Sequence, residues 1–434
     1  MLILIVKIIL SAGLLATFGL VLRFRSRFDA FFVNKGSLWL GLMWVALRLV
    51  PFLTLYVLLG FKTTSDLVGF YNGAVAASQG LMPYRDFITV YAPFYSYLTA
   101  IPILIWYDAR SIVVFMMVIE GLALWGTYRL YRLSLTTVLL YLLLPATLLF
   151  CVVGGQEDIW MWGFGLLTIP LVRHQRILAV GVVLGLALVL TKALFVLFVP
   201  VIFFWVNKKI HLLAGMVIIG VPVLAWLYGV SEWAFLMPMQ LTQDPLAPNL
   251  RSVLHPFLGD LIDRLPLRAY NYTALASVMI LSTVFVWRWK TAGIAYLSML
   301  ARAWVLVYAL IMLLVPSAYA VYAFGFMLPL LAGGIPNWQR GRSLAVLVLF
   351  NFLAAIQPTT WWRLGRRTYA LIDLASPRFL LEYTMQLGIT ASLIYFIVAL
   401  WVESGTSAEP DIVIQRGRLS SPSNDSVESP EVSY

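Results

Sequence analysis

Charged residues are scarce in this sequence. Only 11% of the 434 residues are charged, whereas 62% are hydrophobic, and the mean hydropathy is +0.91. A soluble domain carries about a quarter charged residues, so this chain lacks the polar surface that water requires. The scarcity excludes a soluble globular protein and predicts an integral membrane protein that crosses the bilayer as a bundle of apolar helices.

Cysteine and histidine are also rare. Cys151 is the single cysteine and stands in an apolar run, so an intrachain disulfide is excluded and a small core or lipid-facing residue is expected. His174, His211 and His255 are scattered along the chain, and no spacing of His, Cys and carboxylate residues predicts a zinc site. The sequence therefore indicates no zinc centre.

Acidic residues are outnumbered, with 19 Asp and Glu against 30 Lys and Arg, which gives a net charge of +11. Many basic residues gather in short gaps between apolar runs, where Asp29 is the exceptional acid: Arg23, Arg25, Arg27, Lys35, Arg129, Arg132, Arg173, Arg176, Lys208, Lys209, Arg288, Lys290, Arg340 and Arg342. Such gaps are typical of cytoplasmic loops under the positive-inside rule. The charge therefore predicts an orientation in a bilayer and requires no nucleic-acid partner.

Placing these gaps in the cytoplasm predicts about 13 crossings, with the N-terminus outside and the C-terminus cytoplasmic. The expected spans are residues 1–22, 38–60, 111–128, 134–152, 158–172, 177–191, 193–206, 211–230, 273–287, 294–315, 317–334, 343–356 and 378–402. The first is read as a span because its basic cluster follows the apolar run, unlike that of a signal peptide. We expect one all-α polytopic membrane domain, residues 1–402, in the cell membrane. A disordered cytoplasmic tail, residues 403–434, follows it.

Three longer connections are expected on the outer side, at residues 61–110, 231–272 and 357–377. Within the first, residues 94–107 are too short to span comfortably and are expected to form an interfacial helix. Acids gather on this face: Asp66, Asp86, Asp108, Glu157, Asp158, Asp244, Asp260, Asp263 and Asp373. Long polar loops on a rigid bundle commonly carry function.

The first outer loop holds the most informative pattern. Asp66 follows an inside-to-outside span, so its carboxylate is expected at the outer boundary of the membrane, where a partly buried carboxylate is a candidate general base. Tyr71 lies five residues on, and Gly80-Leu81-Met82-Pro83 predicts a reversal of the chain before Tyr84-Arg85-Asp86. Tyr91-Ala92-Pro93 then closes the segment.

The order Asp, Tyr, Gly-x-x-Pro-Tyr and Tyr-x-Pro resembles the first outer loop of membrane glycosyltransferases with the GT-C fold. The likeness is strongest to glycosyltransferase family 87, whose members depend on polyprenyl-phosphate-mannose. Further similar segments follow in order: Gly154-Gly155-Gln156, Thr191-Lys192 after the Gly-rich run 179–190, and Pro316-Ser317 with Tyr319, Tyr322 and Leu328-Pro329-Leu330. Together they cover roughly residues 38–335.

The sequence also departs from that family's pattern. Tyr91-Ala92-Pro93 stands where a double proline is common, and Glu157-Asp158 follows the glutamine where asparagine is more usual. The late segment lacks the Trp and His that the family tends to carry there. Asn249-Leu250-Arg251-Ser252 only loosely resembles an Asn-x-Ser segment. These departures bear on the sugar and the acceptor more than on the fold.

The resemblance implies an inverting transferase that moves a hexose, mannose in that family, from a polyprenyl-phosphate donor. The acceptor would be a glycan, lipid or protein on the non-cytoplasmic side. In such a reaction Asp66 would take the acceptor's hydroxyl proton, and cations would hold the departing phosphate. Substrate-binding candidates are Tyr71, Tyr84, Arg85, Asp86, Gln156, Glu157, Asp158, Lys192, Arg251 and His255. No cofactor is required, although Asp66 with Asp86 is compatible with a divalent ion.

Simpler interpretations stand beside these assignments. Ser65-Asp66 suits the N-cap of a helix starting at Leu67, and residues 156–158 could cap the following span. Arg85 and Asp86 could form only a surface ion pair, and His255 could serve loop packing. The cluster of Arg363, Arg366 and Arg367 could hold either donor phosphate or anionic lipid heads. Gly181 and Gly185, four residues apart, predict close helix packing rather than a phosphate loop.

A different class of function is a transporter or flippase for a lipid-linked sugar. It would line a polar route through the bundle with Arg48, Glu120, Lys192 and Arg302. The discriminating feature is whether those charges face one continuous cavity or whether polar groups converge only around Asp66. In the enzyme interpretation, Arg48, Glu120 and Arg302 are expected to form structural pairs. An inactive scaffold is the third interpretation.

Overall fold

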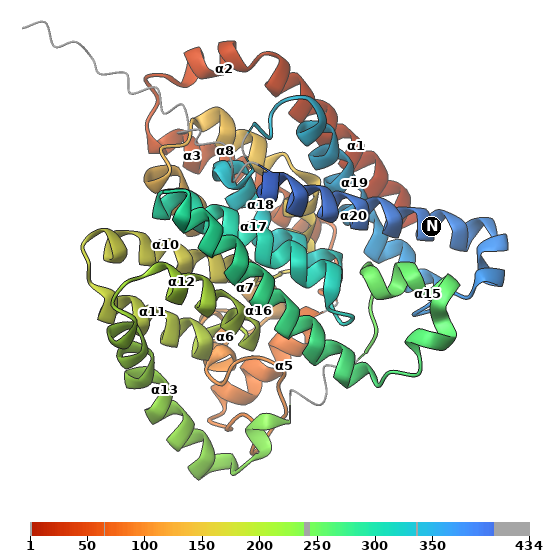
Figure 1. Cartoon of the computed structure of the whole chain (residues 1–434). Helices are drawn as coiled ribbons and strands as arrows, with labels where there is room; N and C mark the ends of the chain where they lie inside the picture. The colour runs from red at the N-terminus through yellow and green to blue at the C-terminus, as the bar shows by residue number, and fades with distance from the viewer. Residues whose placement is uncertain (1, 65, 238–243, 336, 403–434) are drawn as a thin grey trace, which may run out of the picture.

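The structure, a computed structural model, describes residues 2–64, 66–237, 244–335 and 337–402 (Figure 1). Within these ranges every ordered element is a helix of the α, 3-10 or π type, and no β-strand is formed. The all-α fold class is therefore confirmed for the described part of the chain. The tail predicted to be disordered, residues 403–434, lies outside the described residues, as does Ser65.

Eight helices of the described residues are long and apolar enough to cross a bilayer. They are α1 (Leu2–Arg23), α3–η2 (Ser37–Leu58), α7 (Ala109–Leu130), α13 (Lys209–Ser231), α16 (Leu267–Thr291), α17 (Tyr296–Leu314), α19 (Gly341–Leu364) and α20 (Pro377–Val402). Their length and composition agree with the predicted multi-pass membrane protein.

A ninth apolar segment is broken in the middle. Helix α8 (Leu135–Leu142) meets α9–η3 (Pro145–Val153) at an angle of 67°. Pro145 is the first residue after the break and has no N–H to continue the ladder of α8. The expected span 134–152 is therefore present as two bent pieces.

The remaining apolar helices are shorter. They are α6 (Tyr95–Ile105), α10 (Ile159–Arg173), α11 (Ile177–Leu190), η4–α12 (Ala193–Trp205) and η6–α18–η7 (Ala320–Gly334). The 14 residues of α11 extend about 21 Å, against about 30 Å of hydrocarbon. Four of the expected spans correspond to these short helices, so the count of 13 crossings and the GT-C-like arrangement stay predictions.

The connections between helices gather at two ends of the bundle. At one end, which we call the basic end, the gaps rich in Lys and Arg are tied together. There the Tyr131 hydroxyl donates to the Leu297 carbonyl at 2.8 Å, and the Lys290 ammonium donates to the Trp205 carbonyl at 2.7 Å. The short helix α2 (Arg25–Phe32) lies at this end.

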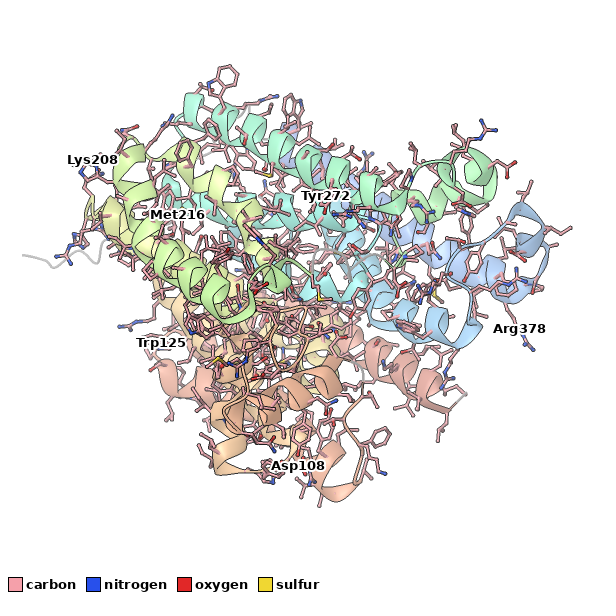
Figure 2. All side chains as sticks on the ribbon, turned by 90° about the horizontal axis from the view of Figure 1, so that it is seen from below. Asp108, Trp125, Lys208, Met216, Tyr272 and Arg378 are labelled. Atoms are coloured by element: carbon pink, nitrogen blue, oxygen red, sulfur yellow. The ribbon has the colours of Figure 1, made fainter. Side chains whose placement is uncertain are left out.

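The other end, which we call the loop end, carries the longer connections. Its elements are α5 (Asp66–Ser78), η5 (Ala234–Leu236), α15 (Leu250–Ile262) and η8 (Leu371–Ala375). Backbone hydrogen bonds join segments far apart in sequence, such as Leu246 N–H to the Pro316 carbonyl at 2.8 Å. Figure 2 shows Lys208 of the basic end at the upper left edge of the molecule and Asp108 of the loop end at its lower edge.

Helix α17 occupies the middle of the bundle (Figure 1). Residues 299–313 of this helix are all buried. A helix that is apolar on all sides is expected in the interior, where it packs against neighbours on every face. By contrast, α1 and α13 are mostly exposed, as suits helices that face lipid.

Helices α11 and α13 cross at two glycines. A Cβ added to Gly181 would lie 2.0 Å from the Leu212 carbonyl oxygen, and one added to Gly215 would lie 2.1 Å from the Leu178 carbonyl oxygen. The two backbones therefore touch at this crossing, in the small-residue packing that membrane helices use. This agrees with the packing role predicted for Gly181.

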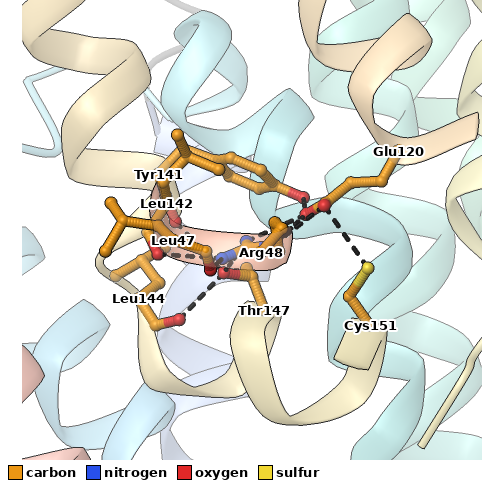
Figure 3. A network of polar contacts seen from close by, with 8 residues as sticks. All are labelled: Leu47, Arg48, Glu120, Tyr141, Leu142, Leu144, Thr147 and Cys151. Carbon is orange, nitrogen blue, oxygen red and sulfur yellow. Dashed lines mark hydrogen bonds and ion pairs between the residues drawn. The ribbon is translucent and has the colours of Figure 1, made fainter. Parts of the chain in front are cut away.

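A polar network lies inside the bundle (Figure 3). The Arg48 guanidinium and the Glu120 carboxylate, both fully buried, pair at 2.8 Å. The hydroxyl of Tyr141 and the thiol of Cys151 donate to Glu120, and Arg48 also donates to the Thr147 hydroxyl. The sequence predicts structural pairing for each of these residues, and the structure shows that they pair with each other.

Candidate functional site

Asp66 is the first residue of α5, shortly after the apolar segment α3–η2 ends at Leu58. Its Oδ2 accepts two hydrogen bonds, from the amide of Gln156 at 3.0 Å and from the hydroxyl of Tyr319 at 2.9 Å. Among the described residues no donor bonds to Oδ1 and no backbone N–H of α5 caps the side chain. The carboxylate is partly exposed and keeps one oxygen for a ligand.

Gln156 belongs to the connection between η3 and α10, together with Glu157 and Asp158. All three side chains are buried. The ammonium of Lys192, in the connection between α11 and η4, lies 2.5 Å from Glu157 Oε1 and 3.2 Å from Asp158 Oδ1. The structure thus brings together five of the predicted site residues, Asp66, Gln156, Glu157, Asp158 and Lys192.

Burial controls the protonation of this group, whose members lie in connections rather than within the spanning helices. Burial raises the pKa of Glu157 to about 7. The carboxylates of Asp158 and Asp66 also raise this pKa, whereas the ammonium of Lys192 lowers it. Burial also raises the pKa of Asp158, against the attraction of Lys192. Burial lowers the pKa of Lys192. The attraction of Asp158 and Glu157 outweighs burial, so the pKa of Lys192 lies well above its usual value.

The charge of the site depends on Glu157. Near pH 7 Lys192 is charged and Glu157 is close to its midpoint. Glu157 and Asp158 both pair with Lys192, whereas Asp66 makes no ion pair within the described part of the chain.

Aromatic side chains surround the group. The Lys192 ammonium lies 5.0 Å from the ring centre of Tyr322 and 6.0 Å from that of Tyr91. Tyr91 stacks on Tyr95 with ring centres 4.6 Å apart. Small-molecule sites are commonly lined in this way by aromatic residues with a few convergent polar groups.

The first loop is anchored to the site by backbone hydrogen bonds. Ala92 N–H donates to the Thr191 carbonyl at 3.4 Å, and Phe94 N–H donates to the Val189 carbonyl at 3.0 Å. The hydroxyl of Tyr84 donates to the Tyr91 carbonyl at 2.5 Å. Tyr84, predicted as a substrate contact, therefore supports the loop that presents Tyr91.

Other predicted site residues of the first loop make their contacts elsewhere. Arg85 and Asp86 form an ion pair at 2.7 Å, and Asp86 also accepts the Met82 N–H, so that its pKa is lowered to about 2 by these hydrogen bonds. Both residues are exposed. The ring of Tyr71 packs against Tyr107, with ring centres 6.2 Å apart. Arg85 and Asp86 thus match the surface ion pair considered as the simpler interpretation.

Arg251 and His255, the predicted site residues of the second loop, form a separate cluster on α15. Arg251 pairs with Asp263 at 2.8 Å. The ring nitrogens of His255 contact the Asp263 carboxylate at 3.1 Å and the Tyr369 carbonyl at 2.8 Å. This cluster fastens α15 to the third loop, which agrees with the packing role considered for His255. Among the described residues no group of three His, Cys, Asp or Glu side chains is placed to hold a metal ion.

Two tyrosines of the group were not assigned a role from the sequence. Tyr308 lies in α17, and its hydroxyl donates to the Asp158 carboxylate at 3.3 Å. The only sequence feature that could have indicated this role is that Tyr308 carries a hydroxyl within an otherwise apolar run. Tyr319 stood in the family-like late segment, but its partnership with Asp66, 253 residues away, carries no local sequence signal.

No protein-family model matches this chain, and no curated protein sequence matches it. The resemblance to membrane glycosyltransferases therefore rests on the sequence motifs quoted for it.

Proposed function

We propose that this chain is an inverting membrane glycosyltransferase. It would move a hexose, mannose by the resemblance, from a polyprenyl-phosphate donor to a hydroxyl of a glycan, lipid or protein acceptor at the loop end. The acceptor oxygen would attack the anomeric carbon while the bond from that carbon to the phosphate oxygen breaks. The bonding pair leaves with the lipid phosphate, and the hydroxyl proton passes to Asp66.

The observation that carries the proposal is the state of the Asp66 carboxylate. Two neutral donors, Gln156 and Tyr319, hold Oδ2, while Oδ1 stays open among the described residues. A general base needs this combination of fixed orientation and one accessible oxygen. The neighbouring rings of Tyr91 and Tyr322 suit a sugar face, because their apolar surfaces can pack against its C–H groups.

Charge at the site also bears on donor binding. A lipid phosphate requires positive charge nearby rather than a general acid. Lys192 is the cation closest to Asp66 in this network, but it already pairs with Glu157 and Asp158. When Glu157 is protonated, the Lys192 ammonium loses one of its two carboxylate partners, so its positive charge is less neutralised. We infer that Lys192 meets the donor phosphate when Glu157 is protonated.

The transporter alternative has less support. Two of its four route-lining charges, Arg48 and Glu120, pair with each other with both side chains fully buried. A third, Lys192, pairs with carboxylates at the loop end. Polar groups therefore converge around Asp66, the feature that favours the enzyme interpretation.

The test is the Asp66→Asn variant, purified in full length and incubated with a panel of polyprenyl-phosphate hexoses and acceptor membranes. Loss of the base is expected to lower transfer by roughly 10²- to 10⁴-fold. Tyr319→Phe, which removes one hydrogen bond to the carboxylate, is expected to lower transfer by a smaller factor, roughly tenfold.

Asp86→Asn is the matched control, because Asp86 is an aspartate of the same loop whose contacts lie elsewhere. It is expected to keep wild-type transfer. Thermal unfolding of each variant in detergent separates loss of function from loss of fold. A folded Asp66→Asn protein that transfers sugar at the wild-type rate would remove Asp66 as the base.

A further inference from the structure

A cavity of about 330 Å³ lies at the basic end, on the side of the molecule formed by α11 and α13. Its lining comprises Gln175, Arg176, Ile177, Leu178, Ala179, Lys208 and His211. Figure 2 shows Lys208 at the edge of the molecule, with Met216 further along the same helix. The Asp66 group lies at the opposite end of the bundle.

The cavity lies beside the crossing of two glycines, because Leu178 belongs to both. Since Gly181 and Gly215 let the backbones of α11 and α13 touch, the first turns of both helices are held side by side. Arg176 immediately precedes α11, and Lys208 immediately precedes α13. Two basic residues that are 32 positions apart in sequence therefore face one cavity.

The described residues place no acidic partner beside the positive charge of the cavity. Within the described ranges, Arg176, Lys208 and His211 make no ion pair and no side-chain hydrogen bond. Two other cations of the basic end are engaged: Arg25 pairs with Asp29, and the Lys290 ammonium donates to backbone carbonyls. Clustered unpaired cations around a hollow attract an anion.

The surface next to the cavity is apolar. Leu178 of α11 and Ile210, Leu213 and Val217 of α13 are all exposed, the second at 80%. Helix α13 as a whole is a peripheral helix with few buried residues. In a bilayer these side chains meet acyl chains, while the cavity lies at the level of the head groups.

We propose that this cavity binds the phosphate head group of an anionic phospholipid whose acyl chains lie along α11 and α13. Arg176 and Lys208 supply charge to the phosphate, and His211 and Gln175 supply hydrogen bonds to its oxygens. Basic pockets between membrane helices are suited to such head groups. A free phosphate ion shares the head-group chemistry but has no contact with the apolar surface.

Lipid retention tests the proposal. The full-length protein, purified in mild detergent, is incubated with phosphatidylglycerol, with phosphatidylcholine or with inorganic phosphate, and bound lipid is counted by native mass spectrometry. Wild type is expected to retain phosphatidylglycerol over phosphatidylcholine. The Arg176→Gln/Lys208→Gln variant is expected to retain roughly 25-fold less phosphatidylglycerol, at roughly fivefold for each cation.

The matched control is Arg129→Gln/Arg132→Gln, which removes two basic residues of the same end that do not line the cavity. It is expected to bind the lipid as wild type does. Equal loss in both double variants would overturn the proposal, since general surface charge would then explain binding. Competition by inorganic phosphate at concentrations near that of the lipid would overturn the lipid assignment. Thermal unfolding confirms that each variant is folded, and none of the readouts depends on sugar transfer.

Discussion

At the scale of single residues, the two buried ionic groups differ in how completely they are satisfied. Glu120 receives donors from Arg48, Tyr141 and Cys151. Glu157 Oε2 and Asp158 Oδ2, in contrast, are buried without a hydrogen-bond partner among the described residues. Buried polar atoms without partners are rare and costly, and they concentrate where a substrate or water completes the site. The network of Arg48 and Glu120 is therefore suited to a structural role, and the group of Glu157, Asp158 and Lys192 is suited to ligand binding.

The protonation of Glu157 leads to a prediction of pH dependence. Because burial raises its pKa to about 7, Glu157 is protonated below that pH and becomes charged above it. A negative charge on Glu157 beside Lys192 opposes binding of a phosphate, so the KM for the donor is expected to rise as the pH increases through about 7. Glu157→Gln is expected to keep a low KM at the higher pH.

The measurement is the donor KM of wild type and of Glu157→Gln across this pH range. Asp86→Asn provides a control, since the pKa of Asp86 is about 2 and its charge does not change over the range. Identical pH profiles for wild type and Glu157→Gln would exclude the effect of Glu157 on donor binding.

At the scale of elements, interruptions of the helices place the site. The segment α9–η3 ends at Val153, and residues 154–158 then turn before α10 begins at Ile159. Gly155 takes a positive φ of 55° in this turn, and a Cβ there would lie 2.5 Å from the Leu67 side chain. A residue other than glycine would push against α5, so Gly155 allows Gln156 to reach Asp66.

The buried pair of α7 and η1 (Val45–Leu49) gives a prediction of stability. Glu120→Ala leaves the charge of Arg48 buried without its carboxylate, so the free energy of unfolding is expected to fall by about 3–5 kcal/mol. Arg48→Met/Glu120→Met is expected to lose less than Glu120→Ala, because no unpaired charge remains. Thermal or denaturant unfolding in detergent measures both. A double variant less stable than Glu120→Ala would contradict this account.

The glycine crossing of α11 and α13 gives a second prediction with a control in the same helix. Gly215→Ala is expected to lower the unfolding temperature, because the new Cβ would lie 2.1 Å from the Leu178 carbonyl oxygen. Gly220→Ala, whose Cβ would have no neighbour within 4 Å, is expected to leave that temperature unchanged or to raise it. Equal behaviour of the two variants would show that the crossing has no packing role.

At the scale of the whole molecule, the two ends of the bundle have opposite character. The basic end carries many of the Lys and Arg residues and few acids, and the loop end carries most of the aspartates, including Asp66. Under the positive-inside rule the basic end is predicted to face the cytoplasm. The proposed transfer would then take place on the far side of the membrane.

Labelling of introduced cysteines tests this orientation. Cys151 is buried, so wild type is expected to react little with a membrane-impermeant maleimide. Ile88→Cys, at an exposed position of the loop end, is expected to react in intact cells. His174→Cys, at an exposed position of the basic end, is expected to react only after permeabilisation. The reverse pattern would invert the orientation.

Much of the architecture follows from local sequence. Apolar runs and the basic gaps between them are properties of short segments, so composition alone determined that the described chain is helical and has several helices long and apolar enough to cross a membrane. Local motifs also singled out Asp66, Gln156 and Lys192 before their contacts were known. Arg85 and Asp86 belong to the same first-loop pattern and were predicted as site residues on the same grounds. Nothing in the local sequence shows that they pair with each other, away from Asp66.

Only the tertiary structure decided which of these polar residues meet. Gln156 lies 90 positions from Asp66, and Tyr319 lies 253 positions from it, so helix packing rather than sequence spacing brings them together. The same packing pairs Arg48 with Glu120 and places Arg176 beside Lys208. Burial then sets the protonation of Glu157, because the free energy of a charge depends on the whole surroundings and not on its neighbours in the chain.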